Sequence, residues 1–275
     1  MTYLTAALLG LVQGITEFLP VSSSGHLSLL QNIFHIDGAD LIFDVLLHVG
    51  TLIPILMVYR RDLRCLRRGL LGLVGMGHDR GRRTPRAREN RRMAIFLVVG
   101  TLPLLLGLLL KGLAERVAAS SVFVGIMLLL TGLVLWASNR YAPAEKPEKN
   151  ISLLDVLLVG LAQALAVLPG LSRSGLTIGA GRLRGFPAKY AVRFSFLLSV
   201  PAVLGAAILT LIDAVRLGFD MGLLPMYLCG MAAAAVSGYF AIRLLRFVAS
   251  RGGLGGFAYY CWGAGIVSLL LSLVA

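Results

Sequence analysis

The apolar positions of this chain gather into long runs, separated by short polar or basic segments. Six of these runs are long enough to cross a bilayer, which requires roughly 20 mostly apolar residues in a helix. The pattern therefore predicts an all-α integral membrane protein with six transmembrane helices. The six runs are residues 41–59, 93–112, 118–138, 189–212, 222–245 and 255–274.

Two further apolar runs are each followed closely by a proline and a polar cluster. Residues 2–18 lead into the cluster SSSGH, and residues 152–168 lead into the cluster SRSG. Irregular backbone at membrane depth is tolerated only where it is buried in protein or lines a water-filled cavity. We therefore predict two re-entrant helical hairpins, at 2–34 and 152–183. For each of them, a kinked full span that ends in an interfacial loop is the alternative.

The two interrupted runs also resemble each other. GLVQ at 10–13 is matched by GLAQ at 160–163, and in both runs a Leu-Pro pair stands just before the serines. Each half then has one hairpin and three spans, and because three is odd, the halves must insert in opposite orientations. Inverted repeats whose broken helices meet near the midplane are a recurrent way to build a polar site in a membrane. The predicted single membrane domain is 1–275, with repeats at 1–138 and 151–275.

Basic residues are concentrated in one part of the chain. Residues 1–59 contain no lysine or arginine, whereas residues 60–92 contain twelve arginines against three acids. Short loops rich in Lys and Arg stay in the cytoplasm, so we expect 60–92 to be a cytoplasmic loop. Both ends of the first hairpin then lie on the outer side of the membrane, and both ends of the second lie on the cytoplasmic side. The loops expected on the same side as 60–92 lie near 139–150, 182–193 and 243–253.

The composition indicates a lipid environment. Hydrophobic residues make up 57% of the chain and charged residues 14%, with a mean hydropathy of +0.85, whereas soluble domains carry about 25% charge. The net charge of +13 is concentrated beside apolar spans, so we interpret it as a topology signal and expect no nucleic-acid partner. Scattered cysteines predict neither disulfides nor a zinc site. We expect the N-terminus to belong to the mature protein, because it lacks a basic region and carries Glu17.

The first polar cluster surrounds an acid. An ionisable residue inside a membrane segment marks function by default, and Glu17 is such a residue, with Gln13 one turn earlier on the same helical face. A Ser/Gly turn that opens a helix offers backbone N–H groups to anions, and a hydroxyl near an imidazole could supply a nucleophile and a base. Taken alone, the serines are explained as well by helix capping, and Glu17 by interfacial solvation. The residues of this turn are Ser22, Ser23, Ser24 and His26.

The second polar cluster contributes a cation. Arg173 lies among Ser172, Ser174 and Thr177 at a predicted helix start, and its planar guanidinium suits phosphate oxygens. A cation in lipid needs an anionic partner, which either Glu17 or a bound phosphate would provide. A purely structural pair of Glu17 with Arg173 is the alternative. Together the two clusters describe a phosphoryl-transfer site, where catalysis is largely positioning and charge neutralisation.

Asp44 and His48 are one helical turn apart on the first full span. They either line the same cavity or form hydrogen bonds across helices, and we favour the second interpretation.

At these residues the chain resembles the undecaprenyl pyrophosphate phosphatase family, also called the bacitracin-resistance proteins. That family carries an acidic-or-Gln-xxx-Glu motif followed by a Ser-rich turn with His, here QGITE at 13–17 and SSSGH at 22–26. It also carries a PGxSRSxxT motif, here residues 169–177 without a mismatch. The likeness extends over the whole chain, including FSFLL at 194–198.

The resemblance implies a fold of six spans and two re-entrant hairpins. It implies a membrane hydrolase that removes the terminal phosphate of undecaprenyl diphosphate, yields the monophosphate lipid carrier for peptidoglycan synthesis and confers bacitracin resistance. It further implies a divalent cation, Mg²⁺ or Ca²⁺, and a location in the bacterial inner (plasma) membrane with the site facing the periplasm. Both a monomer and a homodimer are compatible with the sequence.

Carried over to this chain, the resemblance assigns Glu17 as the acid/base or metal ligand and Ser23 as a candidate nucleophile with His26. Because Gln13 is the uncharged option at its position, metal binding would rest on Glu17 and the substrate phosphates, as is common for Mg²⁺. Ser23, His26 and water stay open as the nucleophile. Arg173 would be the catalytic cation that binds the diphosphate. The implied substrate-binding residues are Gln13, Ser22, Ser24, Ser172, Ser174 and Thr177.

Two other functions share features with this pattern. Type-2 phosphatidic acid phosphatases need a second histidine shortly after the arginine, and the sequence has none after Arg173. A transporter or flippase of an anionic polyprenyl lipid suits an inverted repeat equally well. We favour chemistry, because passive anion binding has little use for a carboxylate such as Glu17 beside the phosphate.

Overall fold

The computed structural model describes residues 2–33, 41–74, 84–217 and 221–273, and within these ranges it is helical and contains no strand. This confirms the all-α class. The helices of the first half are α1 (Tyr3–Phe18), α2 (Ser23–Ile33), α3 (Leu41–Val58), α4 (Arg60–Leu73), α5 (Pro85–Thr101), α6 (Leu104–Val117) and α7 (Ser121–Tyr141). Those of the second half are α8 (Leu153–Leu165), α9 (Arg173–Leu183), α10 (Ala188–Leu217), α11 (Leu224–Ser250) and α12 (Gly256–Leu271).

The long helices agree with the predicted membrane spans. Five described segments are long and apolar enough to cross a bilayer, and α3, which is followed by α4 at a bend of 90°, can supply a sixth. The chain is therefore a multi-pass membrane protein, with the spans near the positions predicted from the apolar runs. The five continuous segments are Pro85–Val117, Ser121–Tyr141, Ala188–Ile212, Met221–Ser250 and Gly253–Leu271.

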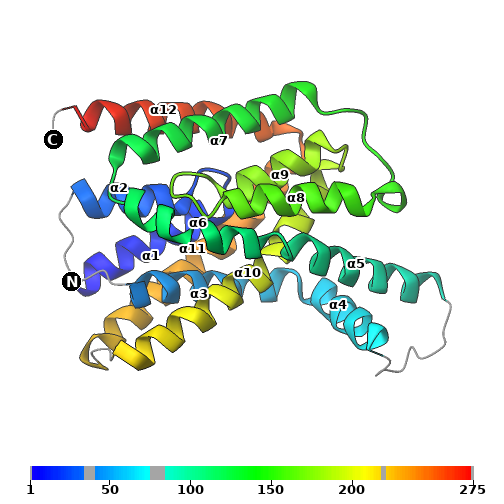
Figure 1. Ribbon diagram of the computed structural model, residues 1–275, viewed down its shortest axis with the longest axis horizontal. Coiled ribbons are helices and arrows are strands. Elements are labelled where there is room, and N and C mark those ends of the chain that lie inside the picture. The colour runs from blue at the N-terminus through cyan, green and yellow to red at the C-terminus, as the bar shows by residue number, and fades with distance from the viewer. Residues whose placement is uncertain (1, 34–40, 75–83, 218–220, 274–275) are drawn as a thin grey trace.

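Two helical hairpins form where the polar clusters interrupt the sequence. Their first arms, α1 and α8, have only 16 and 13 residues, too few to cross the hydrocarbon core at 1.5 Å per residue. In Figure 1 the first hairpin (α1 and α2) lies in the left half and the second (α8 and α9) in the right half, so their turns meet in the middle of the molecule. That these hairpins are re-entrant in a bilayer stays a prediction.

The two halves pack on each other reciprocally. A Cβ on Gly10 of α1 would lie 2.1 Å from the carbonyl oxygen of Gly230 on α11, and one on Gly160 of α8 would lie 2.4 Å from that of Gly100 on α5. Each hairpin thus rests on a long helix of the other half, and small residues at both contacts let the backbones approach closely. An inverted repeat requires this reciprocity, while the repeat boundaries at 138 and 151 stay predictions.

The segment 60–92, expected to be a loop, is largely helical where it is described. Residues 60–73 form α4, and α5 begins at Pro85, where the Thr84 hydroxyl accepts a hydrogen bond from the third residue beyond it. The amphipathic spacing of leucines in α4, rather than overall hydropathy, explains its formation. Leu63 and Leu66 pack against the main core, and Gly69 lies against the backbone of Asn90 on α5.

The main core cluster holds the turn of the first hairpin against α10. Phe18, the last residue of α1, meets Phe196 edge to face with ring centroids 5.3 Å apart, and Tyr59 approaches the same ring. Such aromatic pairs add about 0.5–1.5 kcal/mol beyond area burial. They fix the end of α1, and with it the residue that precedes Phe18, Glu17.

Candidate active site

The first turn reverses the chain at a strained residue. Ser22 has φ of 71°, a left-handed conformation that non-glycine residues rarely adopt. Its hydroxyl accepts a hydrogen bond from the backbone N–H of Gly25 at 3.2 Å, which caps the start of α2. The reversal places Ser23, the first residue of α2, beside the end of α1.

The second turn is fastened to α7. Gly170 has φ of 90°, and a Cβ there would meet the α7 backbone at 2.6 Å, so only glycine fits. The Thr131 hydroxyl of α7 accepts from the N–H of Ser172 at 3.0 Å, and its hydrogen is shared between the carbonyls of Met127 at 3.0 Å and Gly170 at 3.3 Å. The Ser172 hydroxyl caps α9 by accepting from the N–H of Gly175 at 3.0 Å. α9 therefore starts with Arg173 at the meeting point of the two hairpins.

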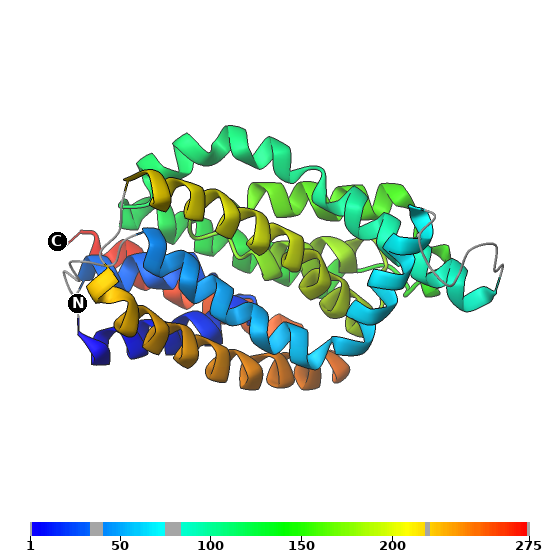
Figure 2. The same cartoon turned by 90° about the horizontal axis from the view of Figure 1, so that it is seen from below.

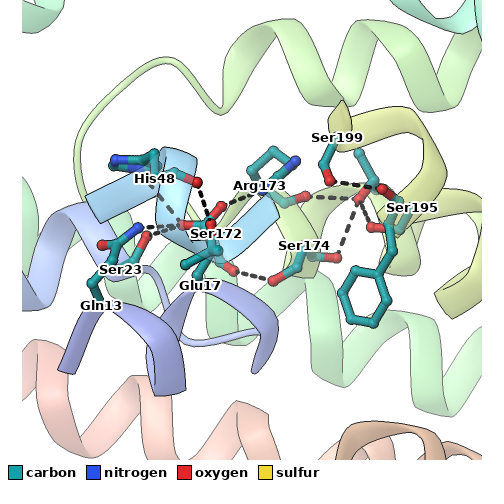
Figure 3. A network of polar contacts seen from close by, with 12 residues as sticks. Gln13, Glu17, Ser23, His48, Ser172, Arg173, Ser174, Ser195 and Ser199 are labelled. Carbon is teal, nitrogen blue, oxygen red and sulfur yellow. Dashed lines mark hydrogen bonds and ion pairs between the residues drawn. The ribbon is translucent and has the colours of Figure 1, made fainter. Parts of the chain in front are cut away.

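The carboxylate of Glu17 is the centre of this meeting point. Only 7% of Glu17 is exposed. Its Oε2 accepts from the Ser23 hydroxyl at 2.6 Å and from the Gln13 amide at 3.0 Å, while its Oε1 pairs with Nη2 of Arg173. Figure 3 shows these side chains converging from α1, α2 and α9. The structure thus brings together four of the predicted site residues, and the buried acid and the partly buried cation neutralise each other.

His48 of α3 reaches the same carboxylate. Its Nε2 lies 3.6 Å from Oε2 of Glu17, and its Nδ1 lies 2.7 Å from the backbone carbonyl of Asp44. Because a carbonyl can only accept, Nδ1 carries the hydrogen, and a proton on Nε2 exists only in the charged imidazolium. The Asp44 side chain forms the cross-helix bond that we favoured, accepting from Gln31 at 3.3 Å. His48, by contrast, lies at the site.

His26 faces away from this carboxylate contact. Its Nδ1 lies 2.7 Å from the carbonyl of Ser22, its Nε2 lies 2.8 Å from the Tyr260 hydroxyl of α12, and the two rings are stacked. In the described part of the chain, the hydroxyl of Ser23 bonds to Glu17 and not to His26. The structure therefore does not join Ser23 and His26 directly, and the catalytic role of His26 stays a prediction.

A chain of hydroxyls continues from the second turn. The Ser174 hydroxyl donates to the carbonyl of Leu19 at 3.3 Å, which ties the two turns together, and lies 3.2 Å from that of Ser172. The Thr177 hydroxyl lies 2.6 Å from that of Ser195 on α10. Ser195 and Ser199 (Figure 3) were not among the predicted site residues. For Ser195 the sequence signal was its place in the FSFLL segment.

Two polar atoms of the site have no partner among the described residues. They are Nη1 of Arg173, a donor, and Oε1 of Gln13, an acceptor, both buried. Leaving a buried polar atom unpaired costs about 1–3 kcal/mol, so such atoms mark places where a ligand or water completes the bonding. The free donor suits a phosphate oxygen, and the free acceptor suits a cation, a hydroxyl or a water.

The described residues offer few metal ligands. No group of three or more His, Cys, Asp or Glu side chains among them could hold a metal ion. The side chains that contact the Glu17 carboxylate and carry an oxygen are those of Gln13 and Ser23. This set does not suit zinc, which takes three or four protein ligands. It fits Mg²⁺, which binds through one or two carboxylates and completes its shell with water and substrate phosphates.

Fold and site together define a class: a multi-pass membrane protein in which two helical hairpins join a buried acid, a guanidinium and several hydroxyls. The sequence matches the family model described as bacitracin resistance protein BacA over residues 6–267. The chain belongs to this family, which confirms the resemblance drawn from the motifs.

Curated relatives cover nearly the whole chain. The chain is 40% identical to an undecaprenyl-diphosphatase of Carboxydothermus hydrogenoformans and 40% identical to one of Methanosphaera stadtmanae, with 98% of each chain covered in both cases. It is 38% identical to an undecaprenyl-diphosphatase of Alkaliphilus metalliredigens, over the full length of both chains.

Proposed function

We propose that this chain is a membrane undecaprenyl-diphosphatase, which hydrolyses undecaprenyl diphosphate to the monophosphate and inorganic phosphate. Membership of the family and the names of the full-length relatives support the activity and the lipid substrate. The observation that carries the proposal is the geometry at Glu17. One carboxylate binds the Ser23 hydroxyl and the Arg173 guanidinium, whose second nitrogen is buried and has no partner among the described residues.

The diphosphate binds where the two turns meet. Its oxygens accept from Nη1 of Arg173 and from free backbone N–H groups at the starts of α2 and α9, where helix N-termini favour anions. The hydroxyls of Ser172, Ser174 and Thr177 line the start of α9. Because these donors are fixed by the caps and by Thr131, they need little rearrangement as charge develops on the transferred phosphoryl group.

The reaction displaces the lipid monophosphate from the terminal phosphorus. An oxygen nucleophile forms a new bond to this phosphorus while the bond to the bridging oxygen breaks, and that oxygen leaves on the lipid. If Ser23 attacks, its proton passes to Glu17 along the 2.6 Å hydrogen bond, and water then hydrolyses the phosphoserine. If water attacks directly, Glu17 accepts the proton of that water.

Protonation of Glu17 has a second effect. It removes the negative charge that holds Arg173, so the guanidinium becomes free to neutralise the phosphate during the transfer. A neutral His48, 3.6 Å away through Nε2, can then take the proton from Glu17. As the other candidate nucleophile, His26 would first have to release Nε2 from the Tyr260 hydroxyl.

A divalent cation, Mg²⁺ or Ca²⁺, belongs to the proposal. Glu17 would be its protein carboxylate, the free Oε1 of Gln13 a further oxygen, and the substrate phosphates would complete the shell. When bound, the cation would neutralise phosphate charge.

We also propose that the protein lies in the bacterial plasma membrane with its site facing the periplasm, because the basic segments then stay inside. A homodimer, which is compatible with the sequence, is not part of this proposal. A flippase has no comparable support, because lipid transport gives no role to the Ser23–Glu17 bond.

Phosphate release from undecaprenyl diphosphate by the purified protein in detergent tests the proposal. With Mg²⁺ or Ca²⁺ present, we expect turnover, and loss of the cation by chelation should abolish it. Absence of release by folded protein with either cation would overturn the assignment.

Matched variants then identify the nucleophile. If Ser23 attacks, Ser23→Ala should lower the rate by at least about 100-fold, the order that general-base chemistry contributes, and no phosphoenzyme should form. His26→Ala should retain more activity. Ser28→Ala, on the same helix but outside the contacts above, is the control and should match the wild type.

A further inference from the structure

One face of α4 carries a dense group of cations that the proposed reaction does not use. At 3.6 residues per turn, these arginines lie within about a third of the helix circumference. All five are exposed, and the ion pairs of the described residues involve other cations. They are Arg60, Arg61, Arg64, Arg67 and Arg68, which together form the arginine face of α4.

The direction of α4 sets it apart from the spans. It leaves α3 at an angle of 90°, and Figure 2 shows it crossing the end of α3 instead of continuing along it. A helix that lies across the ends of spans runs along the membrane surface, at the level of the lipid headgroups.

Packing fixes which face of α4 turns outward. Asp62, the acid of this helix, pairs with Arg193 of α10 at 2.5 Å. Leu63 and Leu66 contact the main core, and a Cβ on Gly69 would lie 2.2 Å from the carbonyl oxygen of Asn90. Because these contacts hold the opposite side, the arginine face points away from the protein.

The apolar side of α4 continues beyond the protein. Leu70 and Leu73 follow Leu63 and Leu66 at helical spacing, yet 40% and 46% of their surfaces are exposed, and 69% of Val74 is exposed. Leucine and arginine on opposite sides of an exposed helix are typical of helices that bind the headgroup and acyl boundary of a bilayer.

We propose that α4 is a binding site for anionic phospholipids. The guanidinium groups of the arginine face bind headgroup phosphates in paired hydrogen bonds, while Leu70, Leu73 and Val74 contact the acyl chains. A topology signal needs only the number of basic residues, whereas these five share one face of a helix that packing holds along the membrane surface. This binding is separate from phosphate hydrolysis, and either proposal can fail without the other.

The test compares wild-type protein with two charge-matched variants in lipid nanodiscs. The first variant replaces the five residues of the arginine face with glutamine. The control replaces five other exposed cations near the same end of the bundle, also with glutamine. They are Arg140, Lys149, Lys189, Arg243 and Arg251. Thermal unfolding is followed in discs of phosphatidylcholine and in discs of its equal mixture with phosphatidylglycerol.

We expect phosphatidylglycerol to raise the unfolding midpoint of the wild type and of the control variant. This shift should shrink as salt increases and be absent from the arginine-face variant. An equal shift in all three proteins, or its loss from the control as well, would overturn the proposal.

A second measurement keeps the test valid if the five-fold variant does not fold. A fluorophore on Leu73→Cys, in otherwise intact protein with its native cysteines replaced, should be quenched more by spin-labelled phosphatidylglycerol than by equally labelled phosphatidylcholine. Equal quenching would contradict anionic selectivity. Inorganic polyphosphate is added as a competitor: if it binds in phosphatidylcholine discs and cancels the lipid effect, the arginine face takes soluble polyanions and the lipid assignment is wrong.

Discussion

Replacing Arg173 with lysine separates a phosphate clamp from a structural ion pair. The guanidinium presents two nitrogens in different surroundings: Nη2 pairs with Oε1 of Glu17, and Nη1 is buried without a partner among the described residues. Lysine keeps the charge, but its single ammonium sits on a shorter and more mobile stem. In Arg173→Lys it can replace the contact with Glu17 or the contact with a phosphate, but not both at once.

The expected loss follows from one missing charged hydrogen bond. Such a bond contributes roughly 1.5–3 kcal/mol, and about 1.4 kcal/mol corresponds to a tenfold change in rate. Arg173→Lys should therefore lower kcat/KM on the order of 10–100-fold. The site is largely buried, which strengthens charged contacts, so we expect the upper part of this range. Arg173→Ala should be only slightly worse.

Steady-state phosphate release from undecaprenyl diphosphate, measured at several substrate concentrations, gives kcat and KM for each variant. Arg182→Lys is the matched control, because Arg182 lies on the same helix but pairs with Glu145 at the surface; its kinetics should not change. If Arg173→Lys stays within about threefold of the wild type, a difference below roughly 1 kcal/mol, Arg173 is only the partner of Glu17 and the clamp is refuted.

Three further outcomes are expected. Glu17→Gln should stay folded but lose turnover by about 100-fold or more, as loss of a general base implies; wild-type rate and metal dependence would contradict its role. Gly10→Ala would place a Cβ 2.1 Å from the Gly230 carbonyl oxygen, so overpacking of about 1–3 kcal/mol should lower the unfolding midpoint, whereas Gly112→Ala, with open space around it, should not. A single cysteine at Arg68 should resist membrane-impermeant thiol reagents in intact cells, and ready labelling would invert the topology.

The spans and the ion pair of the site could be predicted from the sequence because each has a local physical cause. The length of an apolar run decides whether it crosses a bilayer, and a proline followed by serines and glycine interrupts it. A buried cation needs an anion, and in the membrane segments Glu17 was the clear partner for Arg173. The structure places these two side chains together.

The features that the sequence did not predict depend on contacts between distant residues, or on the helical spacing of apolar residues within a polar segment. α4 was taken for a loop because its arginines lower the mean hydropathy, although its leucines recur at helical spacing. Nothing in the local spacing of His48 says that its ring turns toward Glu17, since that contact joins α3 to α1. The pairing of His26 with Tyr260 joins residues 234 positions apart and has no signal in either segment.

The reciprocal packing of the hairpins has a consequence for biosynthesis. α1 enters the membrane early. Its glycine-mediated packing, however, is against α11, which the ribosome completes more than 200 residues later. Until α9 follows, Glu17 also lacks the cation that neutralises it. The first hairpin must therefore stay in the membrane with a carboxylate that no arginine neutralises until the second half has been made. If the chain were cut between its halves, neither half alone could pack its hairpin, because each hairpin packs on a long helix of the other half.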